Sequence, residues 1–126
     1  MILSCNSDDD NNDSSGFLNP PQWIIGTWMD QSEPVYAQIG GFQFTDDNMI
    51  SYNSDGEVLS NLKNEMQDAV DQGILRIEET STSTVYEIKI ISNETVSNQY
   101  KFRKGANNNS IVYDLSVIYD IILTKQ

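Results

Sequence analysis

The sequence predicts an all-β fold: a small antiparallel barrel of about eight strands with one short amphipathic helix. Three observations lead to this class. Short segments from Ile39 onward alternate between apolar and polar residues, the pattern of half-buried strands. Polar turns such as 46–48 and 105–109 separate these segments. Residues 57–71 follow helical spacing instead. Many short strands with tight turns are typical of a barrel or a sandwich, and closure into a barrel removes exposed strand edges.

Each predicted strand places its large apolar side chains on one face. Phe42 and Phe44, for example, share a face, with Gln43 on the opposite one. Residues 22–30 open the folded part, and strands are then expected, in chain order, at 39–45, 49–52, 74–79, 85–91, 99–103, 111–115 and 117–124. A barrel of this size has a narrow interior, which its own side chains can fill.

Residues 57–71 are predicted to form the helix. Ser54 and Glu57 have the spacing of a capping box, and Gly73 is placed to end the helix. The apolar residues at helical spacing are Val58, Leu59, Leu62, Met66, Ala69 and Val70. This face is expected to cover the sheet as a lid or plug, with docking of a partner as the alternative.

The first 19 residues differ from the rest and are predicted to lie outside the folded domain, which spans 20–126. Residues 6–19 are rich in Asn, Asp and Ser, so they are expected to form a flexible acidic tether. Before them, Leu3-Ser4-Cys5 leads into an acidic run. This pattern resembles the lipobox and export signal of surface lipoproteins from the Bacteroidetes. The resemblance implies that residues 1–19 are a leader remnant and tether, that Cys5 carries lipid, and that the protein is anchored in the outer membrane and exposed at the cell surface. The alternative is an ordinary free thiol.

Composition excludes several classes of function. The net charge of −12, with only seven basic residues, would repel nucleic acid, and it leaves a lipid anchor at Cys5 as the route to a membrane. An acidic surface favours a basic protein partner. The chain contains no histidine, so Ser-His-Asp triads, Cys-His pairs and His-based zinc sites are excluded. We therefore expect a non-catalytic protein without metal or cofactor, and a monomer.

The segment Ile25-Gly26-Thr27-Trp28 resembles the Gly-x-Trp signature on the first strand of lipocalins, and more closely the short lipocalin-like domains of bacterial lipoproteins. The resemblance implies that Gly26 lets the strand bend tightly at the base of the barrel and that Trp28 closes this base. Lipocalins often bring an arginine from the last strand onto that tryptophan. Here the last strand offers only Lys125, and Arg103 lies further back.

Aromatic residues recur on one face of successive strands and are the expected lining of the barrel interior. The candidate ligand-binding residues are Trp28, Phe42, Phe44, Tyr86, Tyr100, Phe102, Tyr113 and Tyr119. A hollow interior would bind a small apolar or amphipathic ligand, which the resemblance implies. A filled interior would instead leave a protein- or glycan-interaction module, an accessory subunit or an inhibitor, that binds through its outer surface or through helix 57–71.

Overall fold

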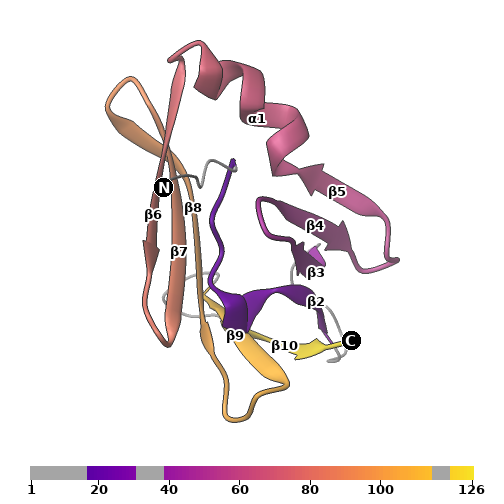
Figure 1. Ribbon diagram of the computed structural model, residues 1–126. Coiled ribbons are helices and arrows are strands. Elements are labelled where there is room, and N and C mark those ends of the chain that lie inside the picture. Colours follow the sequence, from indigo (N-terminus) through magenta and orange to yellow (C-terminus); the bar gives the residue numbers. More distant parts are fainter. Residues whose placement is uncertain (1–16, 31–38, 115–119) are drawn as a thin grey trace, which may run out of the picture.

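The computed structural model describes residues 17–30, 39–114 and 120–126. Nine antiparallel strands form one sheet in the order β5-β4-β3-β2-β10-β9-β8-β7-β6, and the sheet curls into a half-barrel (Figure 1). The elements are a 3-10 turn η1 (Gln22–Ile24), then β2 (Gly26–Asp30), β3 (Ile39–Phe44), β4 (Met49–Asn53), β5 (Val58–Asn61), α1 (Leu62–Asp71), β6 (Leu75–Ser81), β7 (Val85–Ser92), β8 (Thr95–Lys104), β9 (Ser110–Asp114) and β10 (Asp120–Lys125). The predicted all-β, antiparallel, barrel-like class is confirmed.

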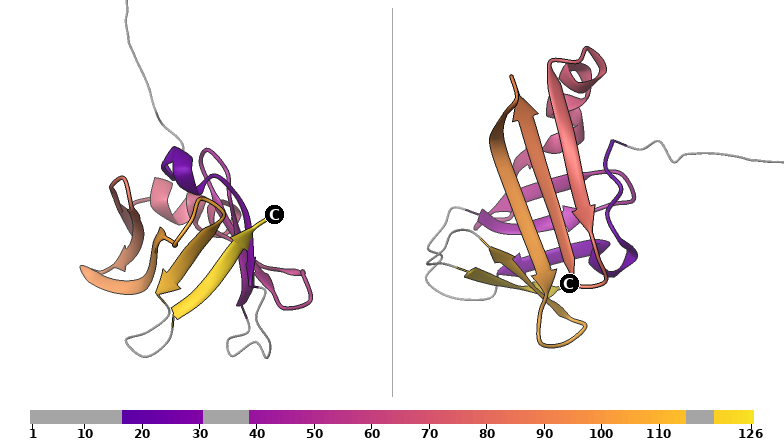
Figure 2. Two further views of the ribbon diagram at one scale, coloured as in Figure 1. Left: turned by 90° about the horizontal axis from the view of Figure 1, so that it is seen from below. Right: turned by 90° about the vertical axis from the view of Figure 1, so that its left-hand side faces the viewer.

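The sheet consists of two meanders, β2 to β5 and β6 to β10, which are joined where β10 pairs with β2. α1 connects β5 to β6, the two ends of the sheet, and contacts both. The ladder therefore leaves β5 and β6 unpaired with each other, so the sheet is a half-barrel rather than the closed barrel predicted. The curl is clearest in the view from below in Figure 2. We call the region between these two end strands the seam.

Alternation along most of the strands places the core on the inner face of the half-barrel. In β7, for instance, Tyr86, Ile88 and Ile90 are buried, and Glu87 and Lys89 between them are not. The core is made of buried apolar side chains, namely Leu18, Ile24, Trp28, Phe42, Phe44, Met49, Leu62, Tyr86, Ile88, Ile90, Phe102, Ile111, Tyr113, Ile121 and Leu123. Burial of such side chains is the main favourable contribution to folding.

The helix begins at Leu62, five residues later than the start predicted at Glu57. Residues 58–61 form β5 and pair with β4 instead. The predicted capping box is a turn, in which the Asn53 side chain accepts hydrogen bonds from the backbone N–H groups of Asp55 and Glu57. The correction has a local cause: Asn53 captures these donors, so the backbone closes a hairpin where a helix would otherwise start.

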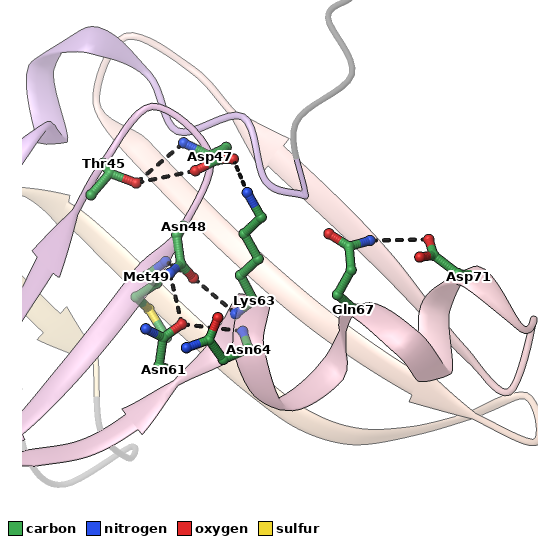
Figure 3. A network of polar contacts seen from close by, with 9 residues as sticks. All are labelled: Thr45, Asp47, Asn48, Met49, Asn61, Lys63, Asn64, Gln67 and Asp71. Carbon is green, nitrogen blue, oxygen red and sulfur yellow. Dashed lines mark hydrogen bonds and ion pairs between the residues drawn. The ribbon is translucent and has the colours of Figure 1, made fainter.

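The N-terminus of α1 is held by a polar network (Figure 3). Asn61 is the N-cap and accepts from the backbone N–H of Asn64 at 3.2 Å. The buried Asn48 donates to Asn61 Oδ1 at 2.8 Å, and its own Oδ1 accepts from the backbone N–H of Lys63 at 2.9 Å. The Lys63 ammonium lies 2.5 Å from a carboxylate oxygen of Asp47. The β3–β4 turn therefore satisfies donors that the first helical turn leaves unpaired.

The helix ends at the predicted glycine. Gly73 has φ +78°, and its N–H donates to the Val70 carbonyl at 3.0 Å. The Ile74 N–H donates to the Ala69 carbonyl at 2.8 Å, which completes a Schellman motif. This ending turns the chain directly into β6 and leaves the Ile74 side chain 59% exposed beside the seam.

Residues 17–24, which we call the strap, run between β6 and the β3–β4 turn (Figures 1 and 2). The Leu18 N–H donates to the Asp47 carbonyl at 3.0 Å, and the Asn19 N–H donates to Glu79 Oε2 on β6 at 2.8 Å. Leu18, which the sequence assigns to the tether, is 1% exposed and belongs to the core. The strap thus covers part of the opening that the unpaired end strands leave.

Candidate functional site

Most of the predicted ligand-binding aromatics come together, but they contact one another instead of lining a hollow. Phe42 on β3 meets Phe102 on β8 with ring centroids 4.9 Å apart, although β2, β10 and β9 lie between these strands in the sheet. Tyr113 lies 4.9 Å from Phe42 and 5.0 Å from Phe102. Phe44 lies 5.0 Å from Phe102 and 6.0 Å from Tyr86. Edge-to-face and stacked contacts at these distances are typical of a packed aromatic core.

Trp28 lies outside this cluster, at the base that the sequence predicts for it. Its indole N–H donates to the Ile24 carbonyl at 2.8 Å, and its side chain is buried. The Lys125 ammonium sits 5.5 Å from the ring centroid, in the range of a cation–π contact. Gly26 has φ +132°, and a Cβ there would lie 3.1 Å from Lys125 Cε. The backbone conformation therefore favours glycine, whereas the lysine side chain would need only a small shift to accommodate a Cβ.

Burial raises the pKa values of the core tyrosines, and one of their hydroxyls donates to a carboxylate. Tyr86 donates to Glu79 Oε2 at 2.6 Å. Burial, followed by this bond and the Glu79 charge, raises the pKa of Tyr86 far above its ordinary value. Burial raises the pKa of Tyr113 to about 12, with an added effect of Tyr100. Tyr100 itself is half-buried at the edge of the cluster, and burial also raises its pKa. These phenols are neutral core groups at ordinary pH, not bases.

A groove of about 550 Å³ lies along β6, on its side of the seam. Its lining comes from the strap, the end of α1, β6, β7 and the β7–β8 turn: Phe17, Val70, Gly73, Ile74, Leu75, Arg76, Ile77, Glu79, Ile91, Asn93 and Glu94. We call this the seam groove. Its lining is mixed: apolar side chains alternate with Asn93 and with the charged groups of Arg76, Glu79 and Glu94, so polar and apolar surface are about equal. The volume lies within the range of roughly 300–1,000 Å³ that is typical of ligand pockets.

The rim of the seam groove carries backbone strain. Asn93 and Glu94, at the tip of the β7–β8 hairpin, have φ of 53° and 63°. This is the left-handed conformation that a two-residue type I′ turn requires and that glycine normally supplies at the second position. Glutamate there costs about 1–3 kcal/mol, and such strain often occurs at functional sites.

A second, smaller hollow of about 210 Å³ lies at the base of the half-barrel, and Trp28 lines it. Among the predicted aromatics within the described residues, Trp28 lines the smaller hollow. The other six line neither hollow: Phe42, Phe44, Tyr86, Tyr100, Phe102 and Tyr113.

Two predicted site residues, Cys5 and Tyr119, lie outside the described residues. Within the described ranges, no group of three or more His, Cys, Asp or Glu side chains is arranged to hold a metal ion. None of the helices in these ranges is long and apolar enough to cross a bilayer.

Sequence reasoning missed the residues that line the seam groove. Ile74, Leu75 and Ile77 were predicted as part of a strand, but that they border an opening follows only from which strands end the sheet. One signal was available: the alternation over 74–79 is less regular than in the other strands, as befits a strand at an end.

Comparison with known proteins gives no match: no family model fits the chain, and no characterised protein or solved structure resembles it significantly. Function is therefore inferred from the geometry.

Proposed function

We propose that this protein is a non-catalytic binding module that holds a small apolar or amphipathic ligand in the seam groove, not among the aromatics of the interior. The seam groove carries this proposal, because it combines ligand-sized volume with a mixed lining of apolar and charged side chains, which suits an amphipathic ligand. Packing of the aromatics against one another supports the same choice, since a ligand between them would have to separate rings whose centroids are about 5 Å apart.

We further propose that the domain is held at the outer membrane by lipid on Cys5, as in lipoproteins of the Bacteroidetes type, and faces outward. What supports this is the residue pattern at 3–5 and the acidic run after it. The strap begins at Phe17, which lines the seam groove, so the tether leads directly into this site. A ligand in the groove would sit next to the attachment of the tether.

The groove is tested with a neutral apolar dye such as Nile red and two matched variants of the full chain. Ile74 borders the groove and is 59% exposed, whereas Ile122 is 63% exposed on the outer side of β10. Ile74→Asp and Ile122→Asp add the same charge at equally exposed positions. We expect Ile74→Asp to weaken dye binding by roughly tenfold or more and Ile122→Asp to leave it within about twofold of wild type. Equal effects of the two variants would contradict the proposal.

The anchor is tested separately. Metabolic labelling with an acyl analogue should mark the protein expressed with its own export signal, and Cys5→Ala should abolish the label. Equal labelling of the variant would refute attachment at Cys5 without touching the groove.

One observation favours a protein partner as a second candidate. β6 borders the seam groove and ends the sheet, so the backbone groups on its outer edge belong to no ladder within the described strands. An extended segment of a partner can add to such an edge as a further strand. If this is the function, a strand-forming peptide will displace the dye, and Ile74→Asp will weaken the binding of both the peptide and the dye.

A further inference from the structure

The smaller hollow at the base of the half-barrel has a composition that differs from the rest of this acidic molecule. It is lined by Gln22, Trp23, Trp28, Lys104, Asn107, Asn108, Ser110, Ile111 and Lys125. We call it the Trp–Lys hollow. It contains both tryptophans and two of the seven basic residues of the chain, and no carboxylate of the described residues lines it. It shares no residue with the seam groove.

Each lysine of the hollow lies over an indole ring, Lys104 over Trp23 and Lys125 over Trp28. Ion pairs among the described residues use Lys63, Arg76 and Arg103. Lys104 and Lys125 take part in none of them. In a chain with a net charge of −12, two cations without carboxylate partners in one hollow form a local site for an anion.

The indoles are fixed in position. Trp23 donates its indole N–H to the Thr82 carbonyl at 3.0 Å, and Trp28 donates to the Ile24 carbonyl at 2.8 Å. Lys104 Nζ lies 5.7 Å from the Trp23 ring centroid, which is within the range of a cation–π contact. Because the N–H groups are already bonded, the rings contribute apolar surface, and that of Trp23 is only partly buried.

The β8–β9 loop adds polar side chains on a rigid support. Its backbone is closed by Gly105 N–H to the Ser110 carbonyl at 2.9 Å and tied to β10 by Lys125 N–H to the Asn109 carbonyl at 2.8 Å. The Asn109 N–H donates to Asn107 Oδ1 at 2.9 Å. These three backbone donors are used within the protein. The side chains of Asn107, Asn108 and Ser110 line the hollow and can form hydrogen bonds with a ligand.

We propose that the Trp–Lys hollow binds one acidic sugar unit, a uronate, through its carboxylate and its ring. Each part of the ligand has a counterpart: the lysines for the carboxylate, the partly exposed indole of Trp23 for the apolar C–H face, and the loop amides for the hydroxyls. The volume of about 210 Å³ is below the usual range for whole ligands, which fits a single unit, free or at the end of a longer glycan. This inference is independent of the seam groove.

Both tryptophans line the hollow, so intrinsic fluorescence of the full chain reports on it directly. The probes are glucuronate, glucose as its neutral match, sodium sulfate, and an oligosaccharide that ends in glucuronate. We expect glucuronate to change the emission saturably and glucose and sulfate not to. Tighter binding of the oligosaccharide than of free glucuronate would identify a glycan end as the source, and equal binding would identify the free sugar acid.

The matched variants are Lys104→Gln and Lys101→Gln, which change the net charge equally. Both lysines are exposed on β8, but only Lys104 lines the hollow. Lys104→Gln should weaken glucuronate binding by about tenfold, and Lys101→Gln by no more than about twofold. An equal loss in both variants, an equal response to sulfate, or no saturable response to either uronate probe would overturn the proposal. Thermal unfolding of each variant confirms that the fold is retained.

Discussion

At the scale of single residues, Glu79 joins three parts of the molecule. It lies on β6, and its Oε2 accepts hydrogen bonds from Tyr86 on β7 and from Asn19 in the strap. It points to the inner face at the seam, where solvent reaches it, so one carboxylate satisfies a core phenol and a strap amide at once. A buried phenol without such an acceptor would cost free energy.

Arg103 and Lys125 have different partners. Arg103 forms ion pairs with Asp114 at 3.2 Å and Asp120 at 2.9 Å. Lys125 is the residue over Trp28. Lysine and arginine are not equivalent here, because the compact ammonium leaves Trp28 as one wall of the Trp–Lys hollow instead of covering it with a planar group.

Tyr113 should make stability depend on pH in the alkaline range. Its pKa rises from 10 in the unfolded chain to about 12 in the fold. The folded state therefore keeps the proton that the unfolded state loses, so the stabilisation from the neutral phenol is fully present below pH 10 and is lost as pH rises toward 12. In Tyr113→Phe, the free energy of unfolding should fall less steeply over this range. Urea unfolding at several pH values measures it, and identical slopes would contradict the assignment.

Glu94 should be a strained residue whose replacement stabilises the fold. Glycine adopts the left-handed conformation without strain because it has no Cβ. Glu94→Gly should therefore raise the free energy of unfolding by roughly 1 kcal/mol. Glu94→Gln keeps the strain and removes the charge. Its effect should be small, because the ion pair with Arg76 spans 3.8 Å and the glutamate side chain is 91% exposed. A stabilisation of equal size in both variants would mean that charge, not backbone strain, matters.

At the scale of elements, the alternating strands were predictable, but β5 was missed and several boundaries differ. β8, for instance, begins at Thr95, where the sequence predicts Gln99. The alternation that places Phe42 and Phe44 on one face survives in β3, and Gly73 ends the helix as expected. Residues 58–61 form a strand, but Val58 and Leu59 also fit the helical spacing of the apolar residues that follow. This segment is a strand because it pairs with β4, and such pairing depends on residues outside the segment.

The two caps can be distinguished by mutation. Asn61→Ala removes the observed N-cap and the acceptor for Asn48, so it should lower the free energy of unfolding by about 1–2 kcal/mol. Ser54→Ala removes the cap predicted from the sequence and should change stability by less than about 0.5 kcal/mol, as at most exposed positions. Urea unfolding of both variants measures the difference. A larger loss for Ser54→Ala would place the helix start at Glu57 after all.

At the scale of the whole molecule, the aromatics meet because the sheet curls tightly. Facing strands β3 and β8 bring Phe42 and Phe102 into contact, and no sequence pattern specifies whether such rings touch or enclose a space. Because the sheet does not close, an opening remains at the seam. The residues that line it have the sequence pattern of ordinary strand or helix positions, so the pattern does not identify them.

The central claim is that a ligand binds in the seam groove while the interior stays filled. The most direct test is methyl NMR of the isoleucines in the full chain during titration with octanol, a small amphipathic probe. Ile74, Ile77 and Ile91 line the seam groove, whereas Ile88 and Ile90 are core residues that do not. We predict saturable shifts of the first three, with the two core methyls unchanged. Shifts confined to Ile88 and Ile90 would place the ligand among the aromatics and contradict the account.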